Sequence, residues 1–380
     1  MVTRIKTKDA WRAGGIILMV AFAFMLLFGA TARAGITLTD ATGREVVLDR
    51  PASLIGINEA DLILSLMLLA DDPVAPIAVW GSAQRLDPGI KAALRAKFPQ
   101  IDQIPEAGSA TPSDFSVEGV VAQSPELYVI RIFDPMWEPV RKRLEAAGIP
   151  VIYLDSPDLP VTAPEDRVIF SLRLLGDAIG QGQRAQEYKE FIAPRYAQIA
   201  RLVADAPARP AVLVDGHATP DCCWVPGAGN RLGDLVDFAG GQIVGSELVS
   251  DYAGKIAAEH ILVADPQVLI ATGGPHLQAS HGLVLGVGRD ETSAQASLDA
   301  VLATGIRPEL SAVRDGRAHG ILHLLTISPF EVLAVEAFAR WIHPEAAGDM
   351  DPAGTLAEMN RRFLPVPLEG TFWVDQKAVP

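Results

Sequence analysis

The sequence predicts an α/β protein of two lobes, each with a mostly parallel sheet, joined by one long rigid helix. Three observations support this fold class. Short apolar segments alternate with amphipathic helical segments along the chain, which is typical of parallel sheets covered by helices. A long helical tract lies near the middle of the chain. A segment of 15 residues recurs at an offset of 141 residues, which indicates two halves of similar construction.

Residues 1–34 are predicted to be a secretory signal peptide. Basic residues precede an uncharged apolar run over 16–30, and Ala32-Arg33-Ala34 places small residues where a signal peptidase cleaves. The apolar run is shorter than the roughly 20 residues that cross a membrane. Cleavage after Ala34 leaves Gly35 first, whereas a lipid anchor requires Cys there. We therefore expect a periplasmic protein without a lipid anchor.

The charge of the exported chain excludes a class of partners. Residues 1–34 contain five of the 32 Lys and Arg residues and one of the 46 acids, so cleavage changes the formal net charge from −14 to −18. A surface this acidic repels nucleic acid and anionic membranes.

The remaining 346 residues exceed what one core usually supports. We expect a monomer with a first lobe over 35–181, an interlobe helix over 182–206 and a second lobe with its tail over 207–380.

The first lobe is predicted from hydrophobic periodicity. An alternating pattern on either side of the turn at 41–43 predicts a hairpin. Further on, apolar strands are expected at 76–80, 126–130 and 149–155. Between the last two, the helical pattern over 139–148 ends at Gly148.

The centre of the chain predicts helices and a junction. Residues 165–179 and 182–205 have helical spacing, with a kink expected at Pro194. Prolines within 207–210 then end the helical pattern, and a strand is expected over 211–217. A helix between two lobes is stiffer than a Gly/Ser linker.

The repeat pairs two acidic residues. Segment 116–130 aligns with 257–271, so that Glu118 matches Glu259 and Pro125 matches Pro266. Each copy reads as a short helix that ends at a Pro turn and leads into a buried strand. The acids should point away from the core at the start of each helix, where the helix dipole favours negative charge.

No catalytic motif is present. The phosphate-binding loop, the zinc-protease helix and the nucleophile elbow are all absent. The glycines of 227–233 lie one residue off a dinucleotide fingerprint, and we interpret 227–241 as a turn that opens a helix capped by Gly240-Gly241. We expect neither an enzyme nor an intrinsic cofactor, and the sequence predicts no set of metal ligands.

Cys222 and Cys223 are the only cysteines, and they are adjacent. Two free thiols are disfavoured in an oxidising compartment. A two-thiolate metal site is open as an alternative, although neighbouring side chains on an extended segment point apart. We favour a vicinal disulfide, which closes almost no loop and therefore has little entropic effect on stability.

Candidate ligand-binding residues follow predicted strands, where open α/β sheets place their binding loops. Arg131 is suited to a carboxylate or an anionic chelate, and its alternative role is an ion pair between lobes. The histidines are alternatively hydrogen-bonded structural residues, and the aromatic side chains are alternatively core residues. The candidates in the first lobe are Asn58, Glu59, Trp80, Arg131 and Phe133, and those in the second are His217, Trp224, Tyr252, His276 and His323.

The order of several segments resembles the periplasmic binding proteins for ferric siderophores, haem and cobalamin. The opening hairpin from ITLTD to PASLI, the strand unit EAAGIPVIYLD, the tract FSLRLLGDAIGQGQRAQEY and the closing RRFLPVPLEGTFW carry this resemblance. It implies two Rossmann-like lobes joined by one rigid helix, with ligand in the cleft between them.

The resemblance also implies a partner and a cargo. Glu118 and Glu259 match acids that dock onto arginines of an ABC permease dimer in the inner membrane. The expected ligand is a ferric siderophore, with haem or cobalamin as alternatives. A periplasmic metal-dependent enzyme using His217, Cys222 and His276 is a further alternative.

Overall fold

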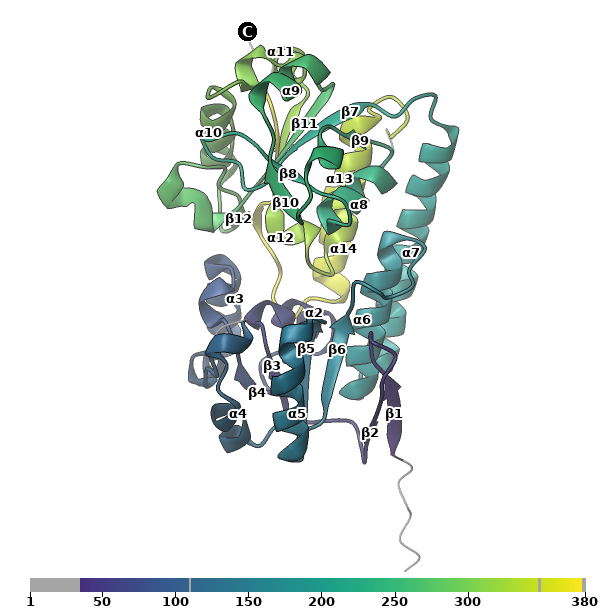
Figure 1. Cartoon of the computed structure of the whole chain (residues 1–380), viewed down its shortest axis with the longest axis vertical. Coiled ribbons are helices and arrows are strands. Elements are labelled where there is room, and N and C mark those ends of the chain that lie inside the picture. The colour runs from purple at the N-terminus through teal and green to yellow at the C-terminus, as the bar shows by residue number, and fades with distance from the viewer. Residues whose placement is uncertain (1–34, 109–110, 348–349, 378–380) are drawn as a thin grey trace, which may run out of the picture.

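The computed structural model describes residues 35–108, 111–347 and 350–377, so the predicted signal peptide lies outside the described residues. Two α/β lobes are linked by the long helix α7 (Gly182–Asp205), as Figure 1 shows. The predicted α/β fold with two lobes is confirmed. Within the described ranges, no helix is both long and apolar enough to cross a membrane.

The first lobe contains a four-stranded sheet in the order β4-β3-β5-β6, in which every pair of neighbours is parallel. An antiparallel hairpin, β1 and β2, precedes it. β5 is buried over its first four residues, as expected for a central parallel strand covered on both faces. The strands are β1 (Ile36–Thr39), β2 (Glu45–Leu48), β3 (Ile55–Ile57), β4 (Ile77–Trp80), β5 (Leu127–Ile132) and β6 (Val151–Asp155). The helices are α2 (Ile63–Leu69), α3 (Pro88–Lys97), α4 (Val117–Gln123), α5 (Glu138–Ala146) and α6 (Pro164–Ala178).

The second lobe contains a five-stranded sheet in the order β15-β13-β11-β7-β9, and only its edge strand β15 is antiparallel to its neighbour. Two short antiparallel pairs, β8 with β10 and β12 with β14, accompany it. The strands are β7 (Ala211–Asp215), β8 (Trp224–Pro226), β9 (Gln242–Ile243), β10 (Ala253–Lys255), β11 (Val268–Gly273), β12 (Gly286–Val287), β13 (Ala318–Leu322), β14 (Gly370–Thr371) and β15 (Trp373–Asp375). The helices are α8 (Arg231–Phe238), α9 (Ala258–Ala264), α10 (Glu291–Leu302), α11 (Ser311–Arg314), α12 (His323–Thr326), α13 (Glu331–Ile342) and α14 (Pro352–Arg362).

The sequence repeat corresponds to a structural repeat. α4 leads into β5, and α9 leads into β11. Each short helix ends at a residue with left-handed backbone, Ser124 (φ 52°) and Asp265 (φ 38°), at equivalent places in the two copies. The turn that follows redirects the chain into the strand, so the repeat predicted a real supersecondary unit.

One hydrophobic core extends from the first lobe through α7 into the second lobe. α7 buries Tyr188, Phe191 and Tyr196 against this core, and the Tyr188 hydroxyl donates a hydrogen bond to the Pro329 carbonyl, 2.6 Å away. A smaller core lies on the other face of the first sheet, under α4 and α5. The lobes are therefore joined by packing as well as by the chain.

Helix α13 is buried along almost its whole length and carries two buried acids. Glu331 accepts hydrogen bonds from Tyr196 and from Arg231. Glu336 accepts a hydrogen bond from the Thr355 hydroxyl and lies 3.7 Å from Arg195, while its second carboxylate oxygen has no hydrogen-bond partner among the described residues. Burial is the main cause that raises the pKa of Glu336 to about 7.

Candidate functional site

The carboxyl ends of the central strands of both sheets meet at the space between the lobes, which is where open α/β sheets bind ligands (Figure 1). A cavity of about 90 Å³ lies there. Its lining comes from both lobes and is rich in charged side chains. These are Asp61, Arg131, Asp155 and Arg167 from the first lobe and Arg231 from the second, which also contributes Ser328.

Arg131 is held by its own lobe. Its Nε donates a hydrogen bond to Glu59 Oε2 at 3.0 Å, and its backbone N–H donates to Asn58 Oδ1 at 2.9 Å. Its acid partner belongs to the same lobe, so the alternative of an ion pair between lobes is wrong. Burial opposes the charge on Arg131, yet the carboxylates of Asp61 and Glu59 raise its pKa above the ordinary value. Nη1 and Nη2 form no hydrogen bond with any described residue, which leaves donors for a ligand.

The cavity contains charged residues that the sequence reasoning missed. Arg167 donates from Nη1 to Asp155 Oδ1 at 2.6 Å, and Arg231 pairs with the buried Glu331. Burial is the main cause that raises the pKa of Asp61. Asp155 ends strand β6, so the expectation that binding residues lie at the ends of strands, which selected Arg131, also applied to Asp155. Arg167 lies in α6 and Arg231 is the first residue of α8, and nothing in the local sequence distinguishes them from surface residues.

The candidate aromatic residues have different surroundings. Trp80 is only 2% exposed and belongs to the core. Phe133 packs edge-on against Tyr153, with ring centroids 5.2 Å apart. Trp224 and Tyr252 are 45% and 63% exposed, and they lie where β8 starts and just before β10. These two exposed rings of the second lobe are the ones available to a ligand without rearrangement.

Asn58 also has an internal role. It is 1% exposed, and its backbone N–H donates to the Val129 carbonyl while its side chain accepts from Arg131. These bonds fasten the loop after β3 to strand β5. In this arrangement Asn58 positions Arg131.

The three candidate histidines of the second lobe come together. His217 follows β7, His276 follows β11, and His323 follows β13 at the start of α12. The Nδ1 atom of His217 lies 2.9 Å from Nε2 of His276, and the ring centroids of His217 and His323 are 4.0 Å apart. The predicted strand 211–217 ends two residues early, and His217 adopts a left-handed backbone (φ 51°) that turns its side chain out of the strand line.

Burial is the main cause that lowers the pKa of all three imidazoles, and that of His323 falls to about 3. His276 also lowers the pKa of His217, and both His217 and His276 lower that of His323, because adjacent positive charges repel. The cluster is therefore uncharged at neutral pH. Neutral imidazoles have a lone pair to offer a metal or a hydrogen-bond donor.

A fully buried ion pair supports the loop that carries His217. Arg307 donates from Nε and Nη2 to Asp215 Oδ2 at 2.9 and 2.6 Å, and from Nη2 to the Thr219 carbonyl at 2.8 Å. Both charged side chains are at most 1% exposed. Burial raises the pKa of Asp215, and Arg307 works against that shift. Sequence reasoning missed this pair because its members are 92 positions apart.

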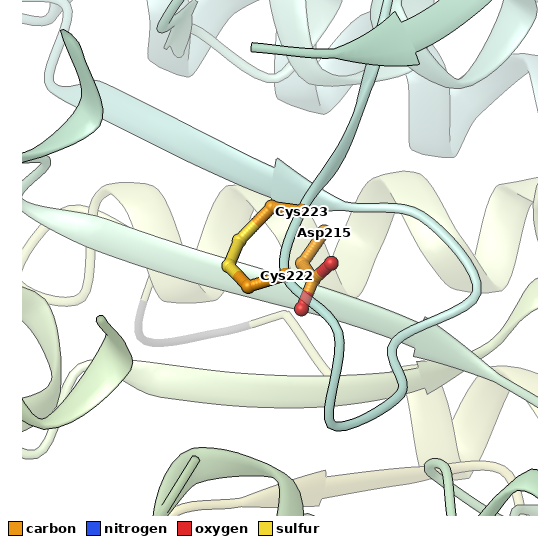
Figure 2. A group of neighbouring side chains, drawn as sticks. All are labelled: Asp215, Cys222 and Cys223. Carbon is orange, nitrogen blue, oxygen red and sulfur yellow. A yellow bond between two sulfur atoms is a disulfide. The ribbon is translucent and has the colours of Figure 1, made fainter. Parts of the chain in front are cut away.

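Cys222 and Cys223 are bonded through their sulfur atoms, and Figure 2 shows them beside Asp215. Their sulfur atoms and a carboxylate oxygen of Asp215 lie within 4.8 Å of one another. A disulfide sulfur is not a thiolate, so the alternative of an enzyme that uses Cys222 as a metal ligand lacks that ligand in this structure.

The paired acids Glu118 and Glu259 are both exposed, each at the second residue of its helix. Glu118 accepts a hydrogen bond from Nη2 of Arg143 at 2.7 Å, an ion pair between two well-exposed side chains. Both carboxylates therefore point away from the core, as the apolar pattern of the two helices predicted.

The family model for periplasmic binding proteins matches residues 78–318, which is more than half of the chain. This chain belongs to the periplasmic binding protein family. Proteins of this family work with ABC permeases in the inner membrane, and the resemblance inferred from the sequence is confirmed at this level.

Solved structures agree with this assignment. The TroA-like periplasmic binding protein FepB from Veillonella parvula is 25% identical, with a TM-score of 0.81 over 90% of this chain and all of that one. The periplasmic binding protein MolA from Haemophilus influenzae, bound to molybdate, is 14% identical (TM-score 0.68, covering 88% of this chain and 99% of that one). A protein of an ABC-type Fe³⁺-hydroxamate transport system from Saccharomonospora viridis is 22% identical (TM-score 0.52, covering 81% and 99%). The last two likenesses show the fold alone.

Proposed function

We propose that this periplasmic binding protein captures an anionic iron complex, a ferric siderophore, between its lobes and delivers it unchanged to an ABC permease. The observation that carries the proposal is Arg131, which lines the interlobe cavity and whose terminal nitrogens have no hydrogen-bond partner among the described residues. In an acidic chain, such a guanidinium is suited to holding a carboxylate or another oxyanion of a bound chelate.

Other features support an anionic, metal-containing cargo. Trp224 and Tyr252 offer exposed aromatic surface on the second lobe, which suits the organic part of a chelate. Two of the similar structures are named for an oxyanion, molybdate, and for a ferric hydroxamate complex. Capture needs no covalent step, because the arrangement of donors and apolar surface acts through binding alone.

Delivery is proposed to use Glu118 and Glu259. Both acids are exposed at equivalent places in the structural repeat, one on each lobe. Two negative groups on a pair of lobes joined by α7 form a two-point contact for basic residues of a permease dimer. Complementary charges of this kind favour encounter and register.

Export to the periplasm is part of the proposal. N-terminal sequencing of the periplasmic fraction should find Gly35 as the first residue. Recovery of the chain with Met1 in the membrane fraction would contradict export by cleavage.

The cargo is tested by titrating the purified mature protein with ferric siderophores, haem, cobalamin and molybdate. Changing Arg131 to Ala should weaken binding of an anionic ferric chelate by about 1.5–3 kcal/mol, the range for hydrogen bonds to charged groups. The matched control is Arg173→Ala, because Arg173 is an exposed α6 arginine that does not line the cavity.

Two results would contradict the proposal. Tight binding of haem or cobalamin, with no binding of ferric siderophores, would show that the proposed cargo is wrong. An Arg131→Ala variant that is folded and binds the chelate as tightly as the Arg173→Ala control would remove Arg131 from the binding site.

A further inference from the structure

Cys222, Cys223 and Asp215 bring three potential metal ligands to one place in the second lobe (Figure 2). The two sulfur atoms and a carboxylate oxygen of Asp215 lie within 4.8 Å of one another. Asp215 and Cys223 are each 1% exposed, whereas Cys222 is half-buried. The group is therefore sheltered, and a solute reaches it from the side of Cys222.

The buried carboxylate of Asp215 has an unused acceptor. Its Oδ2 accepts both hydrogen bonds from Arg307, while Oδ1 has no hydrogen-bond partner among the described residues. The backbone N–H of Trp224, the residue after Cys223, also favours the charged form of this carboxylate. A buried acceptor without a partner is costly. A cation bound at Oδ1 would satisfy it, and a carboxylate that binds a metal is commonly hydrogen-bonded through its other oxygen, as Oδ2 is here.

The loop over 216–224 is held in place without the disulfide. The backbone N–H of Gly216 donates to the Trp224 carbonyl at 2.7 Å, which closes the loop at its base. Arg307 donates to the Thr219 carbonyl at 2.8 Å, which fixes its middle. A disulfide between neighbouring residues closes almost no loop and therefore adds little to stability by restricting the unfolded chain. We expect the loop to keep its shape when the disulfide is reduced.

The charges of the group suit a divalent cation once the thiols are free. In the disulfide form, the guanidinium of Arg307 balances the carboxylate of Asp215. Reduction adds two neutral thiols, and a bound metal ion displaces the proton of each thiol. Two thiolates, one carboxylate, one guanidinium and a divalent cation together carry no net charge. The site therefore stays neutral in each state, as a buried place requires.

We propose that Cys222, Cys223 and Asp215 form a redox-gated site for a thiophilic divalent cation of the Zn²⁺ type, closed by the disulfide and opened by its reduction. Thiolates select zinc over magnesium and calcium. Zinc takes cysteine and carboxylate ligands in tetrahedral geometry, so three protein ligands leave one position for water. The inference does not depend on the cargo of the interlobe cavity.

A dithiol reductant opens the site by thiol–disulfide exchange. One thiolate of the reductant attacks Sγ of Cys222, the more exposed sulfur, and the bond between the two cysteine sulfurs breaks. Cys223 leaves as a thiolate and takes up a proton. The second thiol of the reductant then attacks the mixed disulfide and releases Cys222. The chain gains two electrons and two protons, and the reductant becomes a disulfide.

The test uses Cd²⁺ as the probe, because its thiolate complexes absorb in the ultraviolet. The mature protein is reduced with dithiothreitol, freed of it by gel filtration without oxygen, and titrated with Cd²⁺. One Cd²⁺ per chain is expected, with two protons released for each ion, measured by calorimetry in buffers of different ionisation enthalpy. The protein that keeps its disulfide should show no thiolate absorption.

Variants identify the ligands. Cys222→Ser, Cys223→Ser and Asp215→Asn should each weaken Cd²⁺ binding by more than the roughly 10–100-fold expected for an outer-shell partner. The matched control is Asp221→Asn, because Asp221 is an exposed acid beside Cys222 that pairs with Lys255, and its change should leave Cd²⁺ affinity unaltered. If Asp215→Asn does not fold, the two serine variants decide the result.

Four results would overturn the proposal. The first is a reduced protein that binds no Cd²⁺, and the second is equal binding by the disulfide form. The third is a pair of folded serine variants that bind as tightly as the wild type. The fourth is a disulfide that dithiothreitol does not open in the folded chain, which would leave the site permanently closed. Loss of affinity in Asp221→Asn equal to that in Asp215→Asn would remove Asp215 from the ligand set.

Discussion

The buried pair Arg307 and Asp215 should determine much of the stability of the second lobe. We consider the change Arg307→Met, which keeps an unbranched apolar chain and removes the guanidinium. The wild-type side chain is 0% exposed and donates hydrogen bonds to Asp215, the Thr219 carbonyl and Thr304 Oγ1. Without it, the Asp215 carboxylate would stay buried with no cation to compensate its charge.

The expected loss in the free energy of unfolding is about 3–5 kcal/mol, because breaking a buried pair leaves an uncompensated charge. Asp215→Asn in the same background removes that charge. The double variant should therefore lose less than the sum of the single changes, with a coupling of about 1–3 kcal/mol. Comparing the double variant with the single variants therefore separates the effect of the buried charge on stability from the effect of side-chain packing.

Urea unfolding followed by tryptophan fluorescence and circular dichroism provides the measurement. Arg314→Met is the control, because Arg314 is exposed on α11 nearby, and a change within about 0.5 kcal/mol is expected there. A loss below about 1 kcal/mol for Arg307→Met, or strict additivity in the cycle, would refute the reasoning.

Three further predictions concern other sites. Because burial raises the pKa of Glu336 to about 7, the folded state loses stability as pH rises from about 4.5 to 7. Glu336→Gln should therefore stabilise the protein by up to about 3 kcal/mol at pH 8, and by less than about 1 kcal/mol at pH 5. Changing both Glu118 and Glu259 to Ala should abolish uptake and leave ligand affinity in solution unchanged. The unfolded protein should show no free thiol until Cys222 and Cys223 are reduced.

Each of these has its own check. Denaturation curves at both pH values would show an equal effect of Glu336→Gln if burial did not shift its pKa. Affinity and transport must be measured on the same double variant, and a parallel loss of both would make Glu118 and Glu259 structural or ligand-binding residues. Two thiols titrating without reductant would contradict the disulfide.

The local elements were accessible from the sequence because they depend on short-range periodicity. The helix predicted over 182–205 has those bounds in the structure, and the hairpin, the strand at 76–80 and the repeat all correspond to observed elements. The outward direction of Glu118 and Glu259 also followed from local pattern, since Val120 and Ile261, two residues after them, are buried in the core.

Only part of the candidate site could be predicted from the sequence. The rule that binding loops follow strands selected His217, His276 and His323, but nothing in the sequence brought all three together. The same rule selected Trp80 and Trp224 alike, although one is buried in the core and the other is exposed.

The sequence by itself determined the class of fold, the repeat, the acidic charge and the family, because each of these is a property of neighbouring residues or of composition. Tertiary structure alone decided the partner of Arg131, the pairing of Arg307 with Asp215 and the meeting of three imidazoles. These contacts join residues tens of positions apart. They form where two sheets and α7 bring strand ends together, and that placement depends on the packing of the whole core.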